Sequence, residues 1–252
     1  MVKKVVIYFK NYIAYRHFIF FSYCIEIMNT KVNYELSGNL KPESTNKFII
    51  SDGNCGELEF LEGFKLCTVD KGTMQDLCQE AFKIVNKNGG KSGLKIVILG
   101  GNSCLDPKML EGKSLEELNK EKEKFVGEYV FKVKQPVEDI RKYVEEKGGK
   151  LVICSFIPRL ANFRVKCETT SEILSAAYMD CNMFLKNFSE KFGLPVVHVN
   201  RDLEVKPAKT PPYITGQRKT KTHLYNPDGF TLSLTAQRIV QATLQRVLKN
   251  WI

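Results

Sequence analysis

The sequence lacks the residue patterns of a metalloprotein or of a disulfide-rich protein. Its 252 residues include three histidines and eight cysteines, without a Cys-x-x-Cys pair or the Cys/His spacing of a zinc site. Most cysteines stand in apolar runs, where a thiol behaves as a small core side chain. We therefore expect reduced, structural cysteines, no cofactor and no metal, in an intracellular protein, with the cytoplasm as the expected compartment.

Long hydrophobic runs are also missing. The longest uncharged run near the start, residues 18–25, is much shorter than the roughly 20 residues of a transmembrane helix. Residues 1–28 begin like a signal peptide, but Lys10 and Arg16 interrupt the apolar stretch and no small-residue cleavage site follows. There is thus no strong membrane signal. We interpret residues 1–45 as an N-terminal extension, poorly ordered in part. For residues 1–28 the alternative is a membrane-surface or weak targeting segment.

Acidic residues are absent from one stretch near the carboxyl end of the chain. The whole chain has a formal net charge of +10, and residues 206–221 contain five basic residues and no acidic one. Positive charge that is concentrated in one segment favours an anionic partner more than a uniformly basic surface does.

From residue 46 onward, short apolar runs alternate with amphipathic helical patterns, as is typical of a parallel sheet covered on both faces. Strands are predicted over residues 48–51, 63–69, 94–99, 151–156 and 194–199. Helices are predicted over residues 73–86, 114–124, 136–147, 171–192 and 230–251, with Pro136 opening the third. Residues 46–252 should form one α/β domain, a three-layer α/β/α, flavodoxin-like fold with a five-stranded parallel sheet.

Three turns after predicted strands carry short motifs. Residues 51–54 read Ser-Asp-Gly-Asn, which resembles the Gly-Asp-Ser block of SGNH (GDSL-type) hydrolases, with Gly53 in the position of the catalytic serine. Gly72 is similar to the glycine of the second block. Residues 100–103, Gly-Gly-Asn-Ser, are similar to the Gly-x-Asn-Asp of the third block.

The fourth block of that family, Asp-x-x-His, precedes the last helix. In this chain it reads Thr220-Lys-Thr-His223, and the following Leu-Tyr-Asn-Pro-Asp-Gly-Phe is similar to the family's His-Leu-Asn-Pro-x-Gly-Tyr. All four blocks occur in the family's order over most of residues 46–252. The resemblance therefore implies the SGNH hydrolase fold.

The resemblance also implies a role for each position. In the family, the serine attacks an ester, the histidine takes its proton, the aspartate orients the histidine, and the glycine amide and the asparagine hold the oxyanion. Gly72, Asn102 and His223 match this pattern, whereas Gly53 has no oxygen and Thr220 has no carboxylate. Because loss of a triad nucleophile removes about 10⁶ in rate, we expect a catalytically inactive domain.

A weak esterase or acyl-hydrolase activity is the alternative. A relocated nucleophile would act with His223 and the cradle of Gly72 and Asn102. The candidates for this nucleophile are Ser51, Ser103 and Cys55. The matching residues also have structural explanations, because glycines permit turns, Asn102 is suited to a cap, and His223 follows basic residues as in an exposed loop. Enzyme activity is therefore left open, with inactivity favoured.

The basic stretch directly precedes the His223 block, so it should border the mouth of the ancestral site, at the carboxyl edge of the sheet. Its cations and Tyr213 suit single-stranded nucleic acid, through phosphate neutralisation and base stacking. The family also includes a domain without a working triad that serves RNA binding. The residues predicted to contact RNA or another polyanion are Lys206, Lys209, Tyr213, Arg218, Lys219 and Lys221. A merely solvated loop and a scaffold for a protein partner are the alternatives.

Overall fold

The computed structural model describes part of the chain in detail. The described residues are 32–35, 46–53, 63–88, 93–101, 103–158, 167–205, 219–220, 222–226, 231–249 and 251. The chain divides into two units, Met1–Val32 and Asn33–Ile252, and the α/β fold belongs to the second. Among the described residues, no helix combines the length and the apolar composition needed to cross a bilayer.

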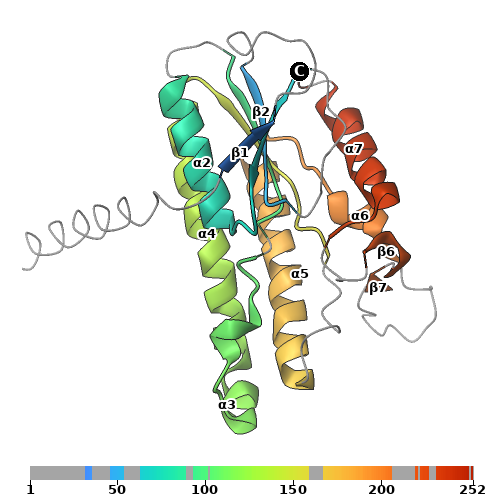
Figure 1. Ribbon diagram of the computed structural model, residues 1–252. Coiled ribbons are helices and arrows are strands. Elements are labelled where there is room, and N and C mark those ends of the chain that lie inside the picture. Colours follow the sequence, from blue (N-terminus) through green and yellow to red (C-terminus); the bar gives the residue numbers. More distant parts are fainter. Residues whose placement is uncertain are drawn as a thin grey trace, which may run out of the picture. The chain divides into compact units, whose positions relative to one another are not determined.

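A five-stranded sheet with the order β1-β3-β2-β4-β5 forms the centre of the fold (Figure 1). Its strands are β1 (Val32–Glu35), β2 (Lys47–Ser51), β3 (Lys65–Val69), β4 (Lys95–Leu99) and β5 (Lys150–Ile153). The strands β2 to β5 pair with their neighbours in parallel. The predicted α/β fold with a parallel sheet is confirmed, and four of the predicted strands are present near their expected positions.

The fifth predicted strand, residues 194–199, is not formed as a strand. Among the described residues, one bridge, between Cys154 and Val197, continues the sheet past β5, and there the Ser155 amide donates to the Val197 carbonyl (2.9 Å). Pro195 has no amide hydrogen to contribute to a ladder, and the helix α6 (Val199–Leu203) begins soon after the bridge. The parallel part of the sheet therefore has four strands, and β1 supplies the fifth.

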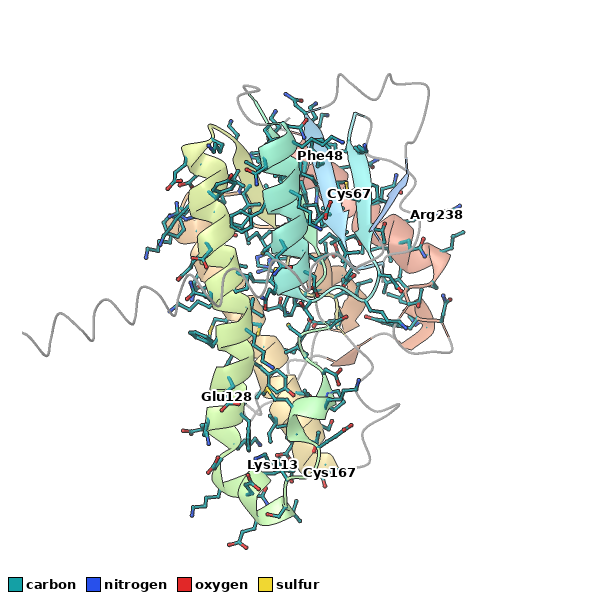
Figure 2. All side chains as sticks on the ribbon, turned by 60° about the vertical axis from the view of Figure 1, so that its left-hand side comes forward. Phe48, Cys67, Lys113, Glu128, Cys167 and Arg238 are labelled. Carbon is teal, nitrogen blue, oxygen red and sulfur yellow. The ribbon has the colours of Figure 1, made fainter. Side chains whose placement is uncertain are left out.

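Helices cover both faces of the sheet (Figure 1). One face packs against α2 (Met74–Lys87), α4 (Lys122–Glu146) and α5 (Glu168–Lys191), and the other against α6 and α7 (Leu234–Leu248). Side chains alternate along each strand, so that Phe48 and Ile50 of β2 enter the first core and Ile49 enters the second. Figure 2 labels Phe48 and Cys67, which lie on neighbouring strands beside α2.

The start of α2 is fixed by a reciprocal cap. The Thr73 hydroxyl accepts from the Asp76 amide (3.3 Å), and the Asp76 carboxylate accepts from the Thr73 amide (2.8 Å). Met74, Leu77 and Ala81 are then buried at helical spacing against the sheet. The predicted helix over residues 73–86 is confirmed within a residue at each end.

The helix predicted to open at Pro136 begins earlier. The α4 helix runs from Lys122 to Glu146 with Pro136 inside it. Proline removes one intrahelical hydrogen bond and costs about 3 kcal/mol. However, Tyr129, Val133 and Val137 are all fully buried, so the apolar stripe continues across the proline. Burial of this apolar stripe therefore outweighs the preference of proline for the first turn of a helix.

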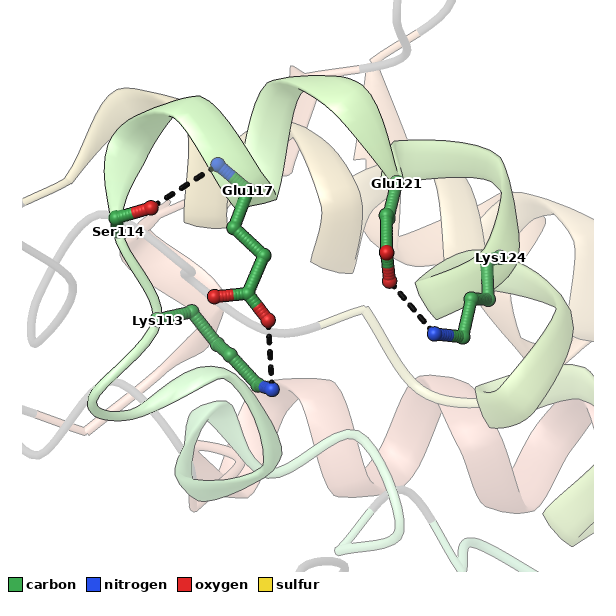
Figure 3. A network of polar contacts seen from close by, with 5 residues as sticks. All are labelled: Lys113, Ser114, Glu117, Glu121 and Lys124. Carbon is green, nitrogen blue, oxygen red and sulfur yellow. Dashed lines mark hydrogen bonds and ion pairs between the residues drawn. The ribbon is translucent and has the colours of Figure 1, made fainter.

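A short helix, α3 (Leu115–Lys120), precedes α4 after the 3-10 turn η2 (Pro107–Leu110). The Ser114 hydroxyl accepts from the Glu117 amide (3.1 Å), and the Glu117 carboxylate pairs with Lys113 (2.8 Å) (Figure 3). A second pair, Glu121 with Lys124 (2.6 Å), stands where α4 begins. These pairs are exposed and contribute little to stability, so they define the helix ends and mark no site.

Candidate functional site

Asp52 connects the carboxyl ends of three adjacent strands. It follows β2 and is 1% exposed, and its Oδ2 accepts a hydrogen bond from the Gly101 amide beyond β4 (2.8 Å). Its carbonyl oxygen accepts from the Lys71 amide beyond β3 (3.2 Å). This edge of the sheet is where ligands bind in open α/β folds.

The contact between Asp52 and the end of β4 depends on Gly100. This residue has φ of +100°, and a Cβ atom built there would lie 2.4 Å from the Asp52 carboxyl group. Such a conformation favours glycine, and such a distance leaves no room for a side chain. The glycine therefore permits the close approach of the two strand ends.

Gly53 occupies the position where the resemblance expects the nucleophile. Its φ is +80°, and a Cβ atom there would lie 3.4 Å from the Thr68 methyl group and 3.8 Å from Asp70 Oδ1. These are ordinary contact distances, so the position has space for a small side chain. Its backbone, however, is in the region that favours glycine.

The relocated nucleophiles differ in accessibility. Ser51 is 1% exposed, and its Oγ accepts a hydrogen bond from the Gly53 amide (3.4 Å), so an ester substrate does not reach it. Ser103 is half-buried in the turn after β4, and Cys55 lies outside the described residues. The buried thiol of Cys67 is a poor nucleophile, because burial raises its pKa to about 12. The six described cysteines are free.

The Gly72 amide has a partner within its own turn. It donates to the Val69 carbonyl (2.9 Å), and a Cβ atom at Gly72 would lie 3.0 Å from Val69 and 3.1 Å from the Leu77 side chain. Packing therefore explains the glycine. An oxyanion would have to compete with the Val69 carbonyl for this amide, and the oxyanion role of Gly72 stays a prediction. Asn102, its expected companion, lies outside the described residues.

The two positions of the fourth block lie on consecutive short elements. Thr220 belongs to β7 (Lys219–Thr220), which pairs in antiparallel fashion with β6 (Glu204–Val205), and His223 lies in the turn η4 (Thr222–Leu224). The His223 side chain is exposed. Between His223 and the other described residues there is no side-chain hydrogen bond, so none of their carboxylates orients the imidazole as the family's aspartate would.

A buried carboxylate that the sequence analysis missed stands opposite Thr220, the position where the resemblance expects an aspartate. Glu204 is in register with Thr220 across the β6–β7 pair and is 6% exposed. The Tyr178 hydroxyl donates to Glu204 Oε1 (2.8 Å) and lies 3.3 Å from the Phe156 carbonyl oxygen. Burial, followed by the charge of Glu204, raises the pKa of Tyr178 well above its ordinary value.

Further hydrogen bonds fix the chain beyond β5. The Asn182 side-chain oxygen accepts from the Phe156 amide (2.7 Å), and the Ser155 hydroxyl donates to Asn200 of α6 (2.8 Å). The Tyr225 hydroxyl, just after η4, donates to the Pro158 carbonyl. The elements that carry Glu204 and His223 are thus attached to the carboxyl end of β5. These partners are distant in sequence, and no local pattern marks them.

The β6–β7 pair lies at the base of the basic loop. Val205 is in register with Lys219, so the chain enters and leaves this loop at one place, at the carboxyl edge of the sheet. The predicted contacts Lys206, Lys209, Tyr213, Arg218 and Lys221 lie outside the described residues, and Lys219 is described in its backbone only. Within the part of the chain that the structure describes, no cluster of three or more His, Cys, Asp or Glu residues is suited to a metal ion.

Comparison with known proteins identifies the fold. No family model and no curated protein matches the sequence. Among solved structures, a GDSL-like lipase from Bacteroides thetaiotaomicron is 14% identical over 86% of this chain and 93% of its own, with a TM-score of 0.54. A putative acylhydrolase from Bacteroides fragilis is 11% identical over 84% of this chain and 91% of its own, with a TM-score of 0.52. The OSK domain of Drosophila Oskar is 12% identical over 80% of this chain and 87% of its own, with a TM-score of 0.47.

The two bacterial structures establish that this chain has the fold of the SGNH (GDSL-type) hydrolases, which the four sequence blocks had predicted. At these identities the comparison shows the fold alone. Any activity has to be argued from the residues of the site.

Proposed function

We propose that this protein is a catalytically inactive domain with the SGNH hydrolase fold, which binds RNA or another polyanion through the basic loop, residues 206–221. The observation that carries the proposal is the β6–β7 pair at the carboxyl edge of the sheet. It closes residues 206–218, which hold three of the five cations and no acid, and Lys219 belongs to the pair itself. Ligands of open α/β folds bind at this edge.

The loss of catalysis is supported by three features of that edge. Gly53 has no oxygen with which to attack a substrate, and Ser51 is buried and hydrogen-bonded to the Gly53 amide. The Gly72 amide, a predicted oxyanion donor, is engaged by Val69. The buried carboxylate of Glu204, opposite Thr220, accepts a hydrogen bond from Tyr178 and so supports the base of the loop.

Polyanion binding is supported by how the loop is held. Its base is a two-residue ladder with a buried carboxylate that is hydrogen-bonded to α5, and the next element is attached through Tyr225. A loop with fixed ends loses less conformational entropy on binding than a free segment of the same length. Tyr213 adds a surface for base stacking among the cations.

The test is a titration of the whole chain with a short fluorescent single-stranded RNA at several salt concentrations. Each phosphate contact with a single strand contributes about −0.7 to the slope of log affinity against log salt. The Arg218→Ala/Lys219→Ala variant should therefore bind more weakly, with a slope shallower by about 1.4. The matched control is Lys120→Ala/Lys134→Ala, which removes the same charge from exposed positions of α3 and α4.

Binding that does not respond to salt, or an equal loss in both variants, would contradict the role of the loop. The inactivity is tested separately, by fluorophosphonate labelling and by turnover of short acyl esters. Labelling of the unmodified protein, with turnover abolished by His223→Ala, would establish the alternative, a hydrolase with a relocated nucleophile.

A further inference from the structure

Each of the four parallel strands begins with a lysine: Lys47 in β2, Lys65 in β3, Lys95 in β4 and Lys150 in β5. Lys47 is in register with Lys95, and Lys95 is in register with Lys150. These three residues, which we name the lysine row, therefore lie side by side on adjacent strands at the amino edge of the sheet. Like charges at opposed positions of neighbouring strands are destabilising.

The lysine row belongs to one face of the sheet. Side chains alternate along a strand, and Ile49, Val97 and Val152, each two residues after a lysine of the row, enter the core beneath α6 and α7. Lys65 is in register with Phe48, whose side chain enters the opposite core. Lys65 thus stands at the same edge and on the other face.

An aromatic surface accompanies the lysine row. The Lys95 Nζ atom lies 5.8 Å from the ring centroid of Trp251, which follows α7 and is half-buried. The Lys47 Nζ atom lies 6.0 Å from the centroid of Phe64. Neighbouring strands are about 4.8 Å apart, so the row spans roughly 10 Å, which is long enough to meet successive phosphate groups.

The charge at the helix ends does not account for the lysine row. The carboxyl ends of α2 and α7 attract cations at their last turns, and Lys87 and Arg246 fulfil that purpose there. Nothing in that effect calls for three lysines in register. Burial, followed by the charges of Lys47 and Lys150, lowers the pKa of Lys95, as expected where like charges are held together.

We propose that the lysine row and Trp251 form a contact surface for single-stranded nucleic acid, separate from the basic loop and at the opposite edge of the sheet. The lysines neutralise consecutive phosphates and one base stacks on the Trp251 indole. This surface would bind the same class of ligand as the proposed function, through a different set of residues.

A nucleic acid fits this surface better than a lipid membrane does. Membrane association of a basic surface requires exposed apolar side chains that enter the bilayer. Among the described residues, the exposed large hydrophobic side chains are Leu115, Phe131, Met179, Met183 and Leu234. None of these lies at the amino ends of the strands or at residue 251, so the described residues place no exposed large apolar side chain beside the lysine row.

The experiment uses the fluorescence of Trp251, which is the only tryptophan in the chain. The full chain is titrated with a short oligouridine at several salt concentrations, with excitation selective for tryptophan. Stacking of a base predicts saturable quenching that weakens with salt. In the Lys47→Gln/Lys95→Gln/Lys150→Gln variant, the salt slope of this signal should be shallower by about 2, with affinity at least about 10-fold lower at low salt.

The matched control is Lys65→Gln, at the same edge and on the other face, which should change the Trp251 signal much less. The loop variant Arg218→Ala/Lys219→Ala should lower total RNA binding and retain the quenching. Thermal melting checks each fold, and Lys150→Gln, at the exposed lysine, replaces the triple variant if that variant does not fold.

Each of four outcomes would overturn the proposal. One is quenching that is absent or indifferent to the lysine variants, and another is an equal loss with Lys65→Gln. The third is a blue shift of Trp251 with phosphatidylserine vesicles and no response to oligouridine, which would assign the surface to a membrane. The fourth is loss of quenching in the loop variant alone, which would contradict the role of the lysine row and leave the proposed function of the basic loop standing.

Discussion

The two edges of the same parallel sheet are built on opposite principles. At the carboxyl edge, the buried Asp52 carboxylate accepts from the Gly101 amide, and Gly100 permits the close approach. At the amino edge, three lysines stand in register on adjacent strands. The first arrangement joins strand ends and stabilises the fold whether or not a nucleophile is present. The second brings like charges together on adjacent strands, and this is the feature behind the proposed anionic partner.

The largest effect is expected at the carboxyl edge, for Gly100→Ala. The new Cβ atom would lie 2.4 Å from a hydrogen-bonded carboxyl group, at a φ of +100°. Overpacking together with the unfavourable φ should lower the free energy of unfolding by roughly 3–5 kcal/mol. Urea denaturation measures the loss.

Gly112→Ala is the matched control for this substitution. Gly112 also has a positive φ, +78°, but a Cβ atom there would meet nothing within 4 Å. Only the conformational cost, about 1–2 kcal/mol, should be seen. Equal losses at the two glycines would show that the approach of Asp52 to Gly100 is unimportant for the fold.

An intermediate effect is expected for introducing, at the carboxyl edge, the serine and aspartate that the resemblance implies. In Gly53→Ser/Thr220→Asp the serine has room, since the nearest described atom would lie 3.4 Å from its Cβ, but its φ of +80° should cost about 1–2 kcal/mol of stability. We expect this variant to react with a fluorophosphonate and the parent protein to remain unlabelled.

Gly53→Ala, which introduces the strain without the hydroxyl, provides the control for stability and should not be labelled. If the double variant folds and stays unlabelled, the site has lost more than its nucleophile and its aspartate. The engaged Gly72 amide is then the next position to examine.

The smallest effect, and one of opposite sign, is expected at the amino edge. Lys95→Gln removes the central charge of the lysine row and should raise the free energy of unfolding by about 0.2–1 kcal/mol at low salt. Added salt should shrink the gain, because it screens the repulsion. Unchanged or lower stability of Lys95→Gln at low salt would mean that the row is not repulsive.

The free energy of unfolding should depend on pH with a definite sign. Because the pKa of Lys95 is lowered in the folded protein, the unfolded chain binds more protons between the folded and unfolded pKa values. The parent protein should therefore gain stability as pH rises through that interval, relative to Lys95→Gln. Urea titrations of both proteins across the alkaline range measure the difference.

Much of the fold could be read from the sequence. Strands that are buried on both faces must be continuously apolar, and β2, β3, β4 and β5 were found for that reason. The run at residues 194–199 has the same composition, but Pro195 and the start of α6 limit it to one bridge. Pro136 produced the opposite error. It predicted the start of a helix, but α4 continues through it because tertiary burial of α4 overrides the local effect of the proline.

For the candidate site, the sequence alone determined which groups are present: Gly53 without an oxygen, Thr220 without a carboxylate, and an acid-free basic loop before His223. Composition and the order of the blocks contain that information. Only the tertiary structure decided which groups meet: Asp52 with Gly101, Glu204 with Tyr178, and three lysines in one row. These contacts depend on strand register and on burial, which arise when segments distant in sequence pack together, and no local pattern specifies them.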